Sequence, residues 1–427
     1  MDRPKLLLIN KFYHDVGPAG GVGRYVVQEE EDLAARGWEV IPFAVADEHA
    51  RPTPWARHFP RARDYATARW REGALGDALS LVWNREAAAN LEALLAEVRP
   101  DVAHIHNIYH HLTPSILGVL RRHRIPAVMT LHDLRLLCPA IHMLRDDRPC
   151  ERCKGRRFHQ AVLGRCVKES RPASLLAAVE TAHQRWRGLY PAAVSLFLCP
   201  SRFYVEKYRA WGFPGDQLRH LPNFVDLDFW HPDRLPAVTE RDTVVYFGRI
   251  SREKGLRGLL DAWALWERGC ADGTLPGRPP RLVIAGDGPC LGNLKARLAM
   301  LKLQTAEAVG PLGVAELRAV LGRARCSVIP SRWYENAPMA ALESLAAGVP
   351  VVGAAIGGLP ELIEPGVTGE TAAPDDPAAL LDALRRAVNL GPEARRSARG
   401  WAERHAARDG HMAELDGILR GLVQGQA

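Results

Sequence analysis

The sequence predicts an α/β protein with two doubly wound domains. Short apolar runs that suit buried strands alternate with amphipathic segments that suit helices along most of the chain. The length of 427 residues exceeds that of one ordinary domain. The sequence PSRF at residues 200–203 returns as PSRW at residues 330–333, an echo expected when two similar sheets are joined in one chain.

The individual elements follow from apolar periodicity and from residues that begin and end helices. Gly37 and Gly348 suit helix ends, and Pro338 suits the first turn of a helix. The expected strands are residues 5–10, 40–44, 102–106, 127–131, 195–199, 244–248, 281–285, 326–330 and 349–352, with a further strand ending near Val309. The expected helices are residues 25–36, 84–98 and 174–189, one that begins at residue 256, one between Pro338 and Gly348, and a helical tail over residues 377–422.

We divide the chain into two domains and a final helix. The N-terminal domain is expected at residues 1–230 and contains a cysteine-rich insert at residues 138–170. A proline-bearing linker follows it. The C-terminal domain is expected at residues 241–405, and a last helix at residues 406–427.

Composition limits the class of protein. With 47% hydrophobic residues the chain can bury sizeable cores, and its net charge of +7 suits anionic substrates or an anionic membrane surface. No apolar run is long enough to span a bilayer, and the start of the chain turns polar after one short strand, unlike a secretory signal. We therefore expect a cytoplasmic protein whose eight cysteines are thiols or metal ligands.

Nucleic acid is not an expected partner, because the sequence shows no aromatic-basic stacking platform or helix-turn-helix signal. Residues 49–73 are rich in arginine, proline and aromatic residues. Such a segment could contact anionic lipid headgroups, so a peripheral position on the inner face of the cell membrane is one interpretation. A solvated basic loop is the simpler one.

Glycines between the first strand and the first helix indicate a phosphate-facing turn. Gly20 and Gly21 lie just before the expected helix, with Arg24 close behind. A strand, a glycine loop and a helix N-terminus let backbone N–H groups approach a phosphate, although such a turn is as often a plain connection. The spacing is not G-x-G-x-x-G, which argues against a dinucleotide fingerprint.

The strand at residues 244–248 leads to a second anion-binding pattern. Arg249 and Lys254 follow the strand and precede a helix. Arginine offers a planar fork to phosphate oxygens and lysine a point charge, and the helix N-terminus adds to the positive field. These groups can replace the divalent cation that other diphosphate enzymes use, although a charged surface turn is the alternative.

The stretch at residues 326–369 holds two carboxylates beside a strand, a loop and a helix N-terminus. Glu335 lies in the loop and Glu343 in the helix. The helix N-terminus can receive an anion, and carboxylates beside it can accept hydrogen bonds from hydroxyls. That combination suits a sugar joined to a diphosphate.

Histidines follow two of the expected strands. His104 and His106 share one face of a strand, but a nearby carboxylate ligand is missing, so structural or acceptor-lining histidines are expected there rather than a metal site. His132 follows the next strand, where side chains line the ligand crevice of such sheets. A satisfied core histidine is its alternative role.

Glu335-Asn336-Ala337-Pro338-Met339 with Glu343 resembles the paired-glutamate motif of the retaining glycosyltransferases of family four. The resemblance covers nearly the whole chain and is most specific over residues 244–369. It implies the GT-B architecture, in which two Rossmann-like domains face a central cleft and a C-terminal helix crosses back to the first domain.

The resemblance also implies roles for individual residues. Arg249 and Lys254 hold the departing diphosphate, and Glu335 and His132 contact the donor sugar. Glu343 binds the ribose hydroxyls. The residues that the resemblance places at the nucleotide sugar, mostly through backbone, are Gly20, Gly21, Gly248, Gly286, Leu312, Asn336, Ala337, Pro338 and Met339.

Four cysteines fall within one short segment. Cys150 and Cys153 form a C-x-x-C knuckle, and Cys138 and Cys166 flank it at similar distances. Four thiolates can close a tetrahedral zinc site that holds a loop without a hydrophobic core. A structural zinc is the interpretation we favour, with unmetallated thiols or a redox pair as alternatives. No catalytic metal is expected. The insert marks a subgroup of the family and is expected to border the acceptor side.

The sequence therefore predicts a retaining glycosyltransferase. The donor is expected to be a UDP- or GDP-sugar, and the acceptor a hydroxyl of a glycan or lipid-linked glycan in polysaccharide or glycolipid synthesis. A nucleotide-sugar epimerase of the same fold needs no acceptor and is one alternative. A non-catalytic, zinc-stabilised binding protein is the other.

Overall fold

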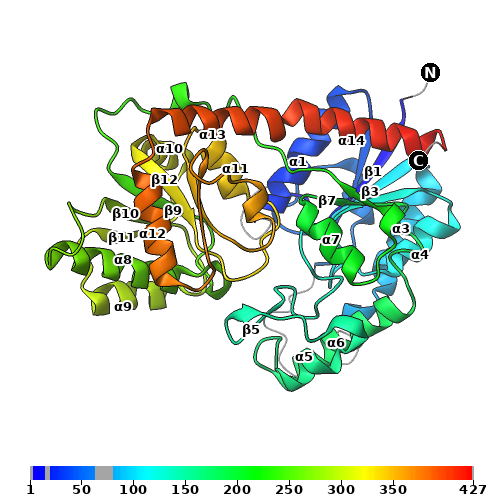
Figure 1. Ribbon diagram of the computed structural model, residues 1–427. Coiled ribbons are helices and arrows are strands. Elements are labelled where there is room, and N and C mark those ends of the chain that lie inside the picture. The colour runs from blue at the N-terminus through cyan, green and yellow to red at the C-terminus, as the bar shows by residue number, and fades with distance from the viewer. Residues whose placement is uncertain (1–2, 15–19, 63–79, 426–427) are drawn as a thin grey trace.

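The computed structural model describes residues 3–14, 20–62 and 80–425 and contains two six-stranded parallel sheets. The strand order is β2-β1-β3-β4-β7-β8 in the first sheet and β11-β10-β9-β12-β13-β14 in the second. Figure 1 shows the two domains side by side, each with helices on both faces of its sheet. The predicted fold class is confirmed.

The first sheet fills the N-terminal part of the chain. Its strands are β1 (Lys5–Ile9), β2 (Glu39–Phe43), β3 (Val102–Ile105), β4 (Ala127–Thr130), β7 (Leu196–Cys199) and β8 (Leu218–His220). The helices around it are α1 (Gly20–Ala35), α3 (Arg85–Glu97), α4 (Ser115–Arg122), α6 (Arg171–Trp186) and α7 (Arg202–Ala210).

Alternating residues of the central strands fill two separate cores. Leu7 and Ile9 of β1 belong to the core shared with α3 and α4, whereas Leu6 and Leu8 belong to the core shared with α1. Successive side chains of a strand point to opposite faces, and a parallel sheet is covered on both, so the strands read as continuous apolar runs. This is why their positions could be predicted from sequence.

The second sheet has the same plan. Its strands are β9 (Thr243–Phe247), β10 (Arg281–Ala285), β11 (Ala306–Gly310), β12 (Ala324–Ile329), β13 (Val351–Ala354) and β14 (Gly369–Ala372). One face packs on α8 (Leu256–Ala271), α9 (Leu291–Leu301) and α12 (Pro377–Val388), and the other on α10 (Val314–Arg323), α11 (Met339–Ala346) and α13 (Pro392–His405).

Two long helices at the end of the chain connect the domains. α13 packs on the C-terminal domain, and α14 (Arg408–Val423) continues across to the N-terminal one (Figure 1). There Met412, Leu415 and Leu419 pack against α1 and β1, and Trp38 Nε1 donates to Asp416 Oδ1 at 2.6 Å. The predicted return of the last helix is confirmed.

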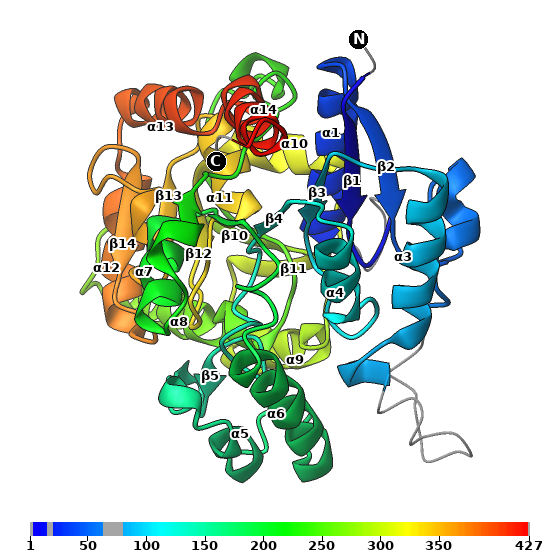
Figure 2. The ribbon, with the colours of Figure 1, turned by 90° about the vertical axis from the view of Figure 1, so that its right-hand side faces the viewer.

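The cysteine-rich insert forms a small unit at the other side of the molecule. It contains the hairpin of β5 (Leu144–Arg145) and β6 (Arg148–Pro149) and helix α5 (His159–Leu163). Asp146 and Asp147 both have positive φ, as a two-residue type I′ turn requires. In Figures 1 and 2 the insert lies opposite α13 and α14.

Some expected features fall outside the description or differ from it. The basic segment lies outside the described residues from residue 63 on, as do residues 15–19 of the glycine turn. The edge strands β8 and β14 were not predicted, because short strands with one neighbour carry little apolar pattern. No helix in the described part of the chain is long and apolar enough to cross a membrane.

Candidate active site

The candidate site lies where the two domains meet. In a parallel sheet the carboxyl ends of all strands share one edge, so the residues after β9 and β12 come together. Backbone and side-chain contacts join this edge to the N-terminal domain. Asn336 Nδ2 donates to the carbonyl of Leu131 at 3.0 Å, and Asn223 Nδ2 donates to the carbonyl of Ala337 at 3.1 Å.

Lys254 and Glu335 form an ion pair at the centre of this edge. Lys254 Nζ lies 2.7 Å from Glu335 Oε1, which also accepts from Ser331 Oγ at 2.5 Å. Burial alone would raise the pKa of Glu335, but Lys254 and the Ser331 hydroxyl outweigh it and hold the pKa below its usual value. Glu335 is therefore a carboxylate that can accept hydrogen bonds.

Arg249 lies two residues after β9 at the same edge of the sheet, and the residue is exposed. Its backbone carbonyl accepts from Tyr246 Oη at 2.6 Å, which fixes the loop. In the described part of the chain, no ion pair or side-chain hydrogen bond of Arg249 is found. An anion could therefore bind this side chain without breaking an existing contact.

Helix α11 adds a second positive feature and the second glutamate. Its N-cap is Pro338, which makes no side-chain capping bond, so the first N–H groups have no side-chain partner at the cap. Glu343 lies one turn further on, and its Oε1 is 3.8 Å from Nη1 of Arg24 in α1 of the other domain. Burial raises the pKa of Glu343 to about 7, only partly offset by Arg24.

The glycines of the turns that follow β9 and β10 are required by close backbone contacts. Gly286 has φ +139°, and a Cβ there would lie 1.8 Å from the carbonyl oxygen of Gly248. Gly255 has φ +71°, and a Cβ would lie 1.9 Å from the carbonyl oxygen of Pro330. Only glycine lets these turns approach one another. Leu312, half-buried, follows β11 at the same edge.

Gly20 and Gly21 are the first residues of α1 rather than a turn before it. A Cβ on Gly21 would lie 3.8 Å from Cγ of Met339. The N-terminus of α1 therefore faces that of α11 across the domain interface, which places these predicted residues of both domains together.

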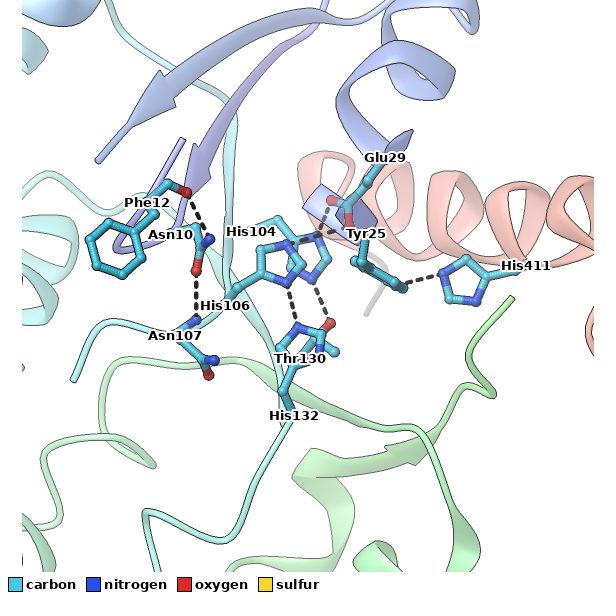
Figure 3. Close-up of polar contacts among 10 residues, drawn as sticks. All are labelled: Asn10, Phe12, Tyr25, Glu29, His104, His106, Asn107, Thr130, His132 and His411. Carbon is cyan, nitrogen blue, oxygen red and sulfur yellow. Dashed lines mark hydrogen bonds and ion pairs between the residues drawn. The ribbon is translucent and has the colours of Figure 1, made fainter. Parts of the chain in front are cut away.

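His132 is half-buried at the end of β4 and belongs to a network of buried polar groups (Figure 3). Its Nε2 lies 2.9 Å from Nδ1 of His106, and Nε2 of His106 lies 3.4 Å from Oε2 of Glu29. Oε1 of Glu29 accepts from Nδ1 of His104 at 2.5 Å, and Thr130 Oγ1 lies 2.8 Å from Nε2 of the same ring.

Glu29 corrects the expectation that no carboxylate lies near His104 and His106. Sequence reasoning missed Glu29 because it belongs to α1 and lies 75 positions away from His104 in the chain. Its signal was present in the helix pattern: Glu29 occupies the same buried stripe as Tyr25 and Leu33. A carboxylate in an apolar stripe requires polar partners.

Among the described residues, only Glu29, His104 and His106 bring three possible metal-ligand atoms within 4.8 Å of one another. The 2.5 Å separation of Glu29 Oε1 and His104 Nδ1 is that of a hydrogen bond. Two ligands of one tetrahedral zinc would lie roughly 3.3 Å apart. The contact between Glu29 and His104 therefore fits a hydrogen bond better than two ligands of one metal ion.

The insert contacts the two loops that carry Lys254 and Glu335. Asp147 at the hairpin tip accepts from Arg252 Nε at 2.5 Å and lies 3.3 Å from Arg332 Nη1. Tyr334 Oη donates to Glu151 Oε1 at 2.9 Å. The insert thus reaches the predicted donor side, a contact that sequence reasoning missed because nothing local to Asp147 marks it.

The four cysteines of the insert line one small cavity, together with apolar residues such as Met143 and Trp211. Burial raises the pKa of Cys138 to about 11 and that of Cys153 to about 12, so both are neutral thiols at pH 7. The sulfurs are spread more widely than the ligand atoms of Glu29, His104 and His106, since no three of them lie within 4.8 Å of one another.

Two family models match the chain next to each other. The model described as Glycosyltransferase Family 4 matches residues 19–229, and the model described as Glycosyl transferases group 1 matches residues 231–404. The class of protein that this fold and site define is the GT-B glycosyltransferase.

Individual relatives agree with this class. The chain is 28% identical over 404 residues to D-inositol 3-phosphate glycosyltransferase of Actinosynnema mirum, covering 91% of this chain and 88% of the relative. It is 34% identical over 212 residues to glycogen synthase of Mycobacterium tuberculosis, and this match spans about half of each chain, 49%.

Solved structures share the fold over nearly the full length. Sucrose-phosphate synthase from Thermosynechococcus elongatus has a TM-score of 0.69 at 20% identity, covering 99% of this chain and 100% of that one. HepE from Anabaena, solved with UDP and glucose, has a TM-score of 0.66 at 16% identity, covering 98% and 100%. At these identities the likeness establishes the fold alone.

Proposed function

We propose that the chain transfers a sugar from a nucleotide diphosphate sugar to a hydroxyl of a glycan, with retention of configuration. The observation that carries this proposal is the ion pair of Lys254 with buried Glu335, next in the chain to the uncapped N-terminus of α11 and its buried Glu343. Arg249 is an exposed cation in the same loop as Lys254. Positive groups there suit a diphosphate, and Glu335 and Glu343 suit sugar and ribose hydroxyls. HepE, which shares the fold, was solved with UDP-glucose.

The proposed chemistry uses the departing diphosphate as the base. The bond from the sugar carbon to the phosphate oxygen breaks, and the acceptor oxygen bonds to the same face of that carbon. The acceptor proton passes to a leaving phosphate oxygen. Arg249 and Lys254 stabilise the negative charge that grows on the diphosphate, so the proposed reaction requires no catalytic metal. Trapping a covalent glycosyl-enzyme on a carboxylate would contradict this route.

The test is a screen of UDP-, GDP- and ADP-sugars for release of the nucleoside diphosphate, with and without glycan acceptors. Release that depends on an acceptor is expected for a transferase. Conversion of the donor sugar without any acceptor would support the epimerase alternative, and no turnover or binding would support a non-catalytic protein.

We also propose that Cys138, Cys150, Cys153 and Cys166 bind a structural zinc. Their convergence on one cavity supports this, although the thiols must move closer to ligate. Zinc would deprotonate them despite the raised pKa values. Metal analysis of the purified protein should find one zinc per chain, lost in the Cys150→Ser/Cys153→Ser variant and retained in the control Cys270→Ser. Equal zinc in both variants would contradict the site.

A lipid-linked acceptor and contact with the inner membrane surface remain proposals that rest on the basic residues. In the described part of segment 49–73, Arg57 and Arg61 already pair with Glu97 and Glu86. Binding to vesicles with and without anionic lipid should distinguish a membrane-contacting segment from a solvated basic loop. Equal binding to both would argue against the membrane proposal.

A further inference from the structure

We propose that Glu29, acting through His106, fixes His132 as the tautomer that carries its proton on Nε2, so that Nδ1 is a hydrogen-bond acceptor for a donor-sugar hydroxyl. Glu29 and His106 are then positioning residues. The proposal rests on the proposed function, since it names how His132 would meet the donor.

Glu29 is wholly buried, and its carboxylate faces one nitrogen of His104 and one of His106. Burial would raise the pKa of Glu29, but the two neighbouring rings outweigh it and hold the pKa below its usual value. An ionised carboxylate only accepts hydrogen bonds. At 3.4 Å Nε2 of His106 and Oε2 of Glu29 are too poorly aligned for a hydrogen bond, but a lone pair on that nitrogen would be repelled by the carboxylate, so His106 carries its proton on Nε2.

The ring of His106 is completely buried, and burial lowers its pKa, so it is neutral and carries a single proton. With that proton on Nε2, its Nδ1 is an acceptor. The nitrogen 2.9 Å away is Nε2 of His132, which must donate. The carboxylate thus sets the proton positions of both rings in turn, as carboxylates do for histidines elsewhere.

Nδ1 of His132 is the ring nitrogen that does not face His106. The pKa of His132 is lowered well below the usual value by burial, so this ring too carries one proton, on Nε2. Nδ1 is left as a bare acceptor. Figure 3 shows His132 at the end of this chain of groups that is farther from Glu29. The preceding carbonyl, that of Leu131, accepts from Asn336, which places His132 next to the Glu335 loop.

A bare acceptor on His132 would also discriminate between donor sugars. A site that accepts a hydrogen bond from a hydroxyl rejects a group that cannot donate, because the buried acceptor is then unpaired. A fixed tautomer therefore selects a donor sugar with a hydroxyl at that position.

The test measures the tautomer by nitrogen NMR of histidine-labelled protein, with the His132 signals assigned by their loss in His132→Asn. The wild type should show His132 with a protonated Nε2 and a bare Nδ1. In Glu29→Gln, the amide oxygen keeps the hydrogen bond from His104 and the amide NH₂ faces His106. This should reverse the tautomers of His106 and His132 and move the His132 proton to Nδ1.

Thr130→Val is the matched control. It removes a buried hydrogen bond of His104 at a similar depth but lies off the path to His132, so the His132 tautomer should not change. If Glu29→Gln does not fold, His106→Asn replaces it and should give a mixture of His132 tautomers. A protonated Nδ1 in the wild type, or an unchanged His132 in folded Glu29→Gln, would overturn the proposal.

A second NMR measurement uses bound ligands. Saturating UDP-glucose should shift the Nδ1 resonance of His132 as it accepts a hydrogen bond, whereas UDP alone should not. A shift with UDP alone would contradict the sugar contact. Nucleotide release is measured separately, so failure of the tautomer leaves the proposed function standing.

Discussion

At the scale of single residues, burial decides what each charged side chain can do. Glu335 and Glu343 are both buried, yet their pKa values move in opposite directions. Glu335 has a lysine at 2.7 Å, whereas the nearest cation to Glu343 is 3.8 Å away on an exposed arginine. A carboxylate pair with separated pKa values suits one permanent acceptor and one that ionises when a ligand binds.

This difference predicts proton release when UDP binds near pH 7. With a pKa of about 7, Glu343 is largely protonated below that pH in the free protein. Ribose hydroxyls that donate to it would favour the ionised form and lower the pKa, so a proton leaves. Calorimetry in buffers of different ionisation enthalpy measures this release. Glu343→Gln should abolish it, and an unchanged proton count in that variant would rule out Glu343 as the source.

Arg249 allows catalysis to be separated from stability. Its side chain is exposed, so Arg249→Ala should change the free energy of unfolding by no more than about 0.5 kcal/mol. Loss of one positive group at the diphosphate should lower turnover by about 10²–10³-fold. Nucleotide release and chemical denaturation check both. The control Arg281→Ala, which breaks an exposed pair with Glu307, should leave turnover unchanged.

At the scale of elements, sequence reasoning succeeded where a pattern is local. The central strands are apolar on both faces, and β1 and β9 were placed to within a residue or two. The loop after β12 was identified because Glu335, Pro338 and Glu343 are close in sequence. Glu29 and Asp147 were missed, because each meets its partners only after distant elements pack together.

The insert should stabilise the two loops that carry Lys254 and Glu335. Asp147 contacts Arg252 and Arg332, and both flank the Lys254–Glu335 pair in sequence. Asp147→Asn should lower global stability by less than about 1 kcal/mol, because the pairs are partly exposed. It should increase hydrogen exchange in residues 249–255 and 331–336. Unchanged exchange there would mean that the hairpin only rests on these loops.

At the scale of the whole molecule, α14 ties the C-terminal end of the chain to the first domain. Leu415 is fully buried against that domain, so Leu415→Ala should cost about 2–5 kcal/mol of unfolding free energy. Leu422→Ala, in the same helix but partly exposed, is the control and should cost clearly less. Similar losses in both variants would contradict the role given to α14.

The two domains also meet through Glu361, which accepts from the backbone N–H groups of Arg202 and Phe203 at 2.8 and 2.6 Å. These contacts, with those of Asn336, hold the C-terminal domain against the start of α7. The sequence predicted two domains but not this contact, because it depends on how the folded domains dock. The docked arrangement is what brings Arg24 to Glu343 and Gly21 to Met339.

We propose that the C-terminal domain holds the departing diphosphate while the buried glutamates hold sugar and ribose. A crystal structure with UDP bound tests it most directly. The diphosphate should contact Arg249, Lys254 and the first turn of α11, with the ribose at Glu343. A diphosphate bound elsewhere, for instance within the N-terminal domain alone, would contradict the claim.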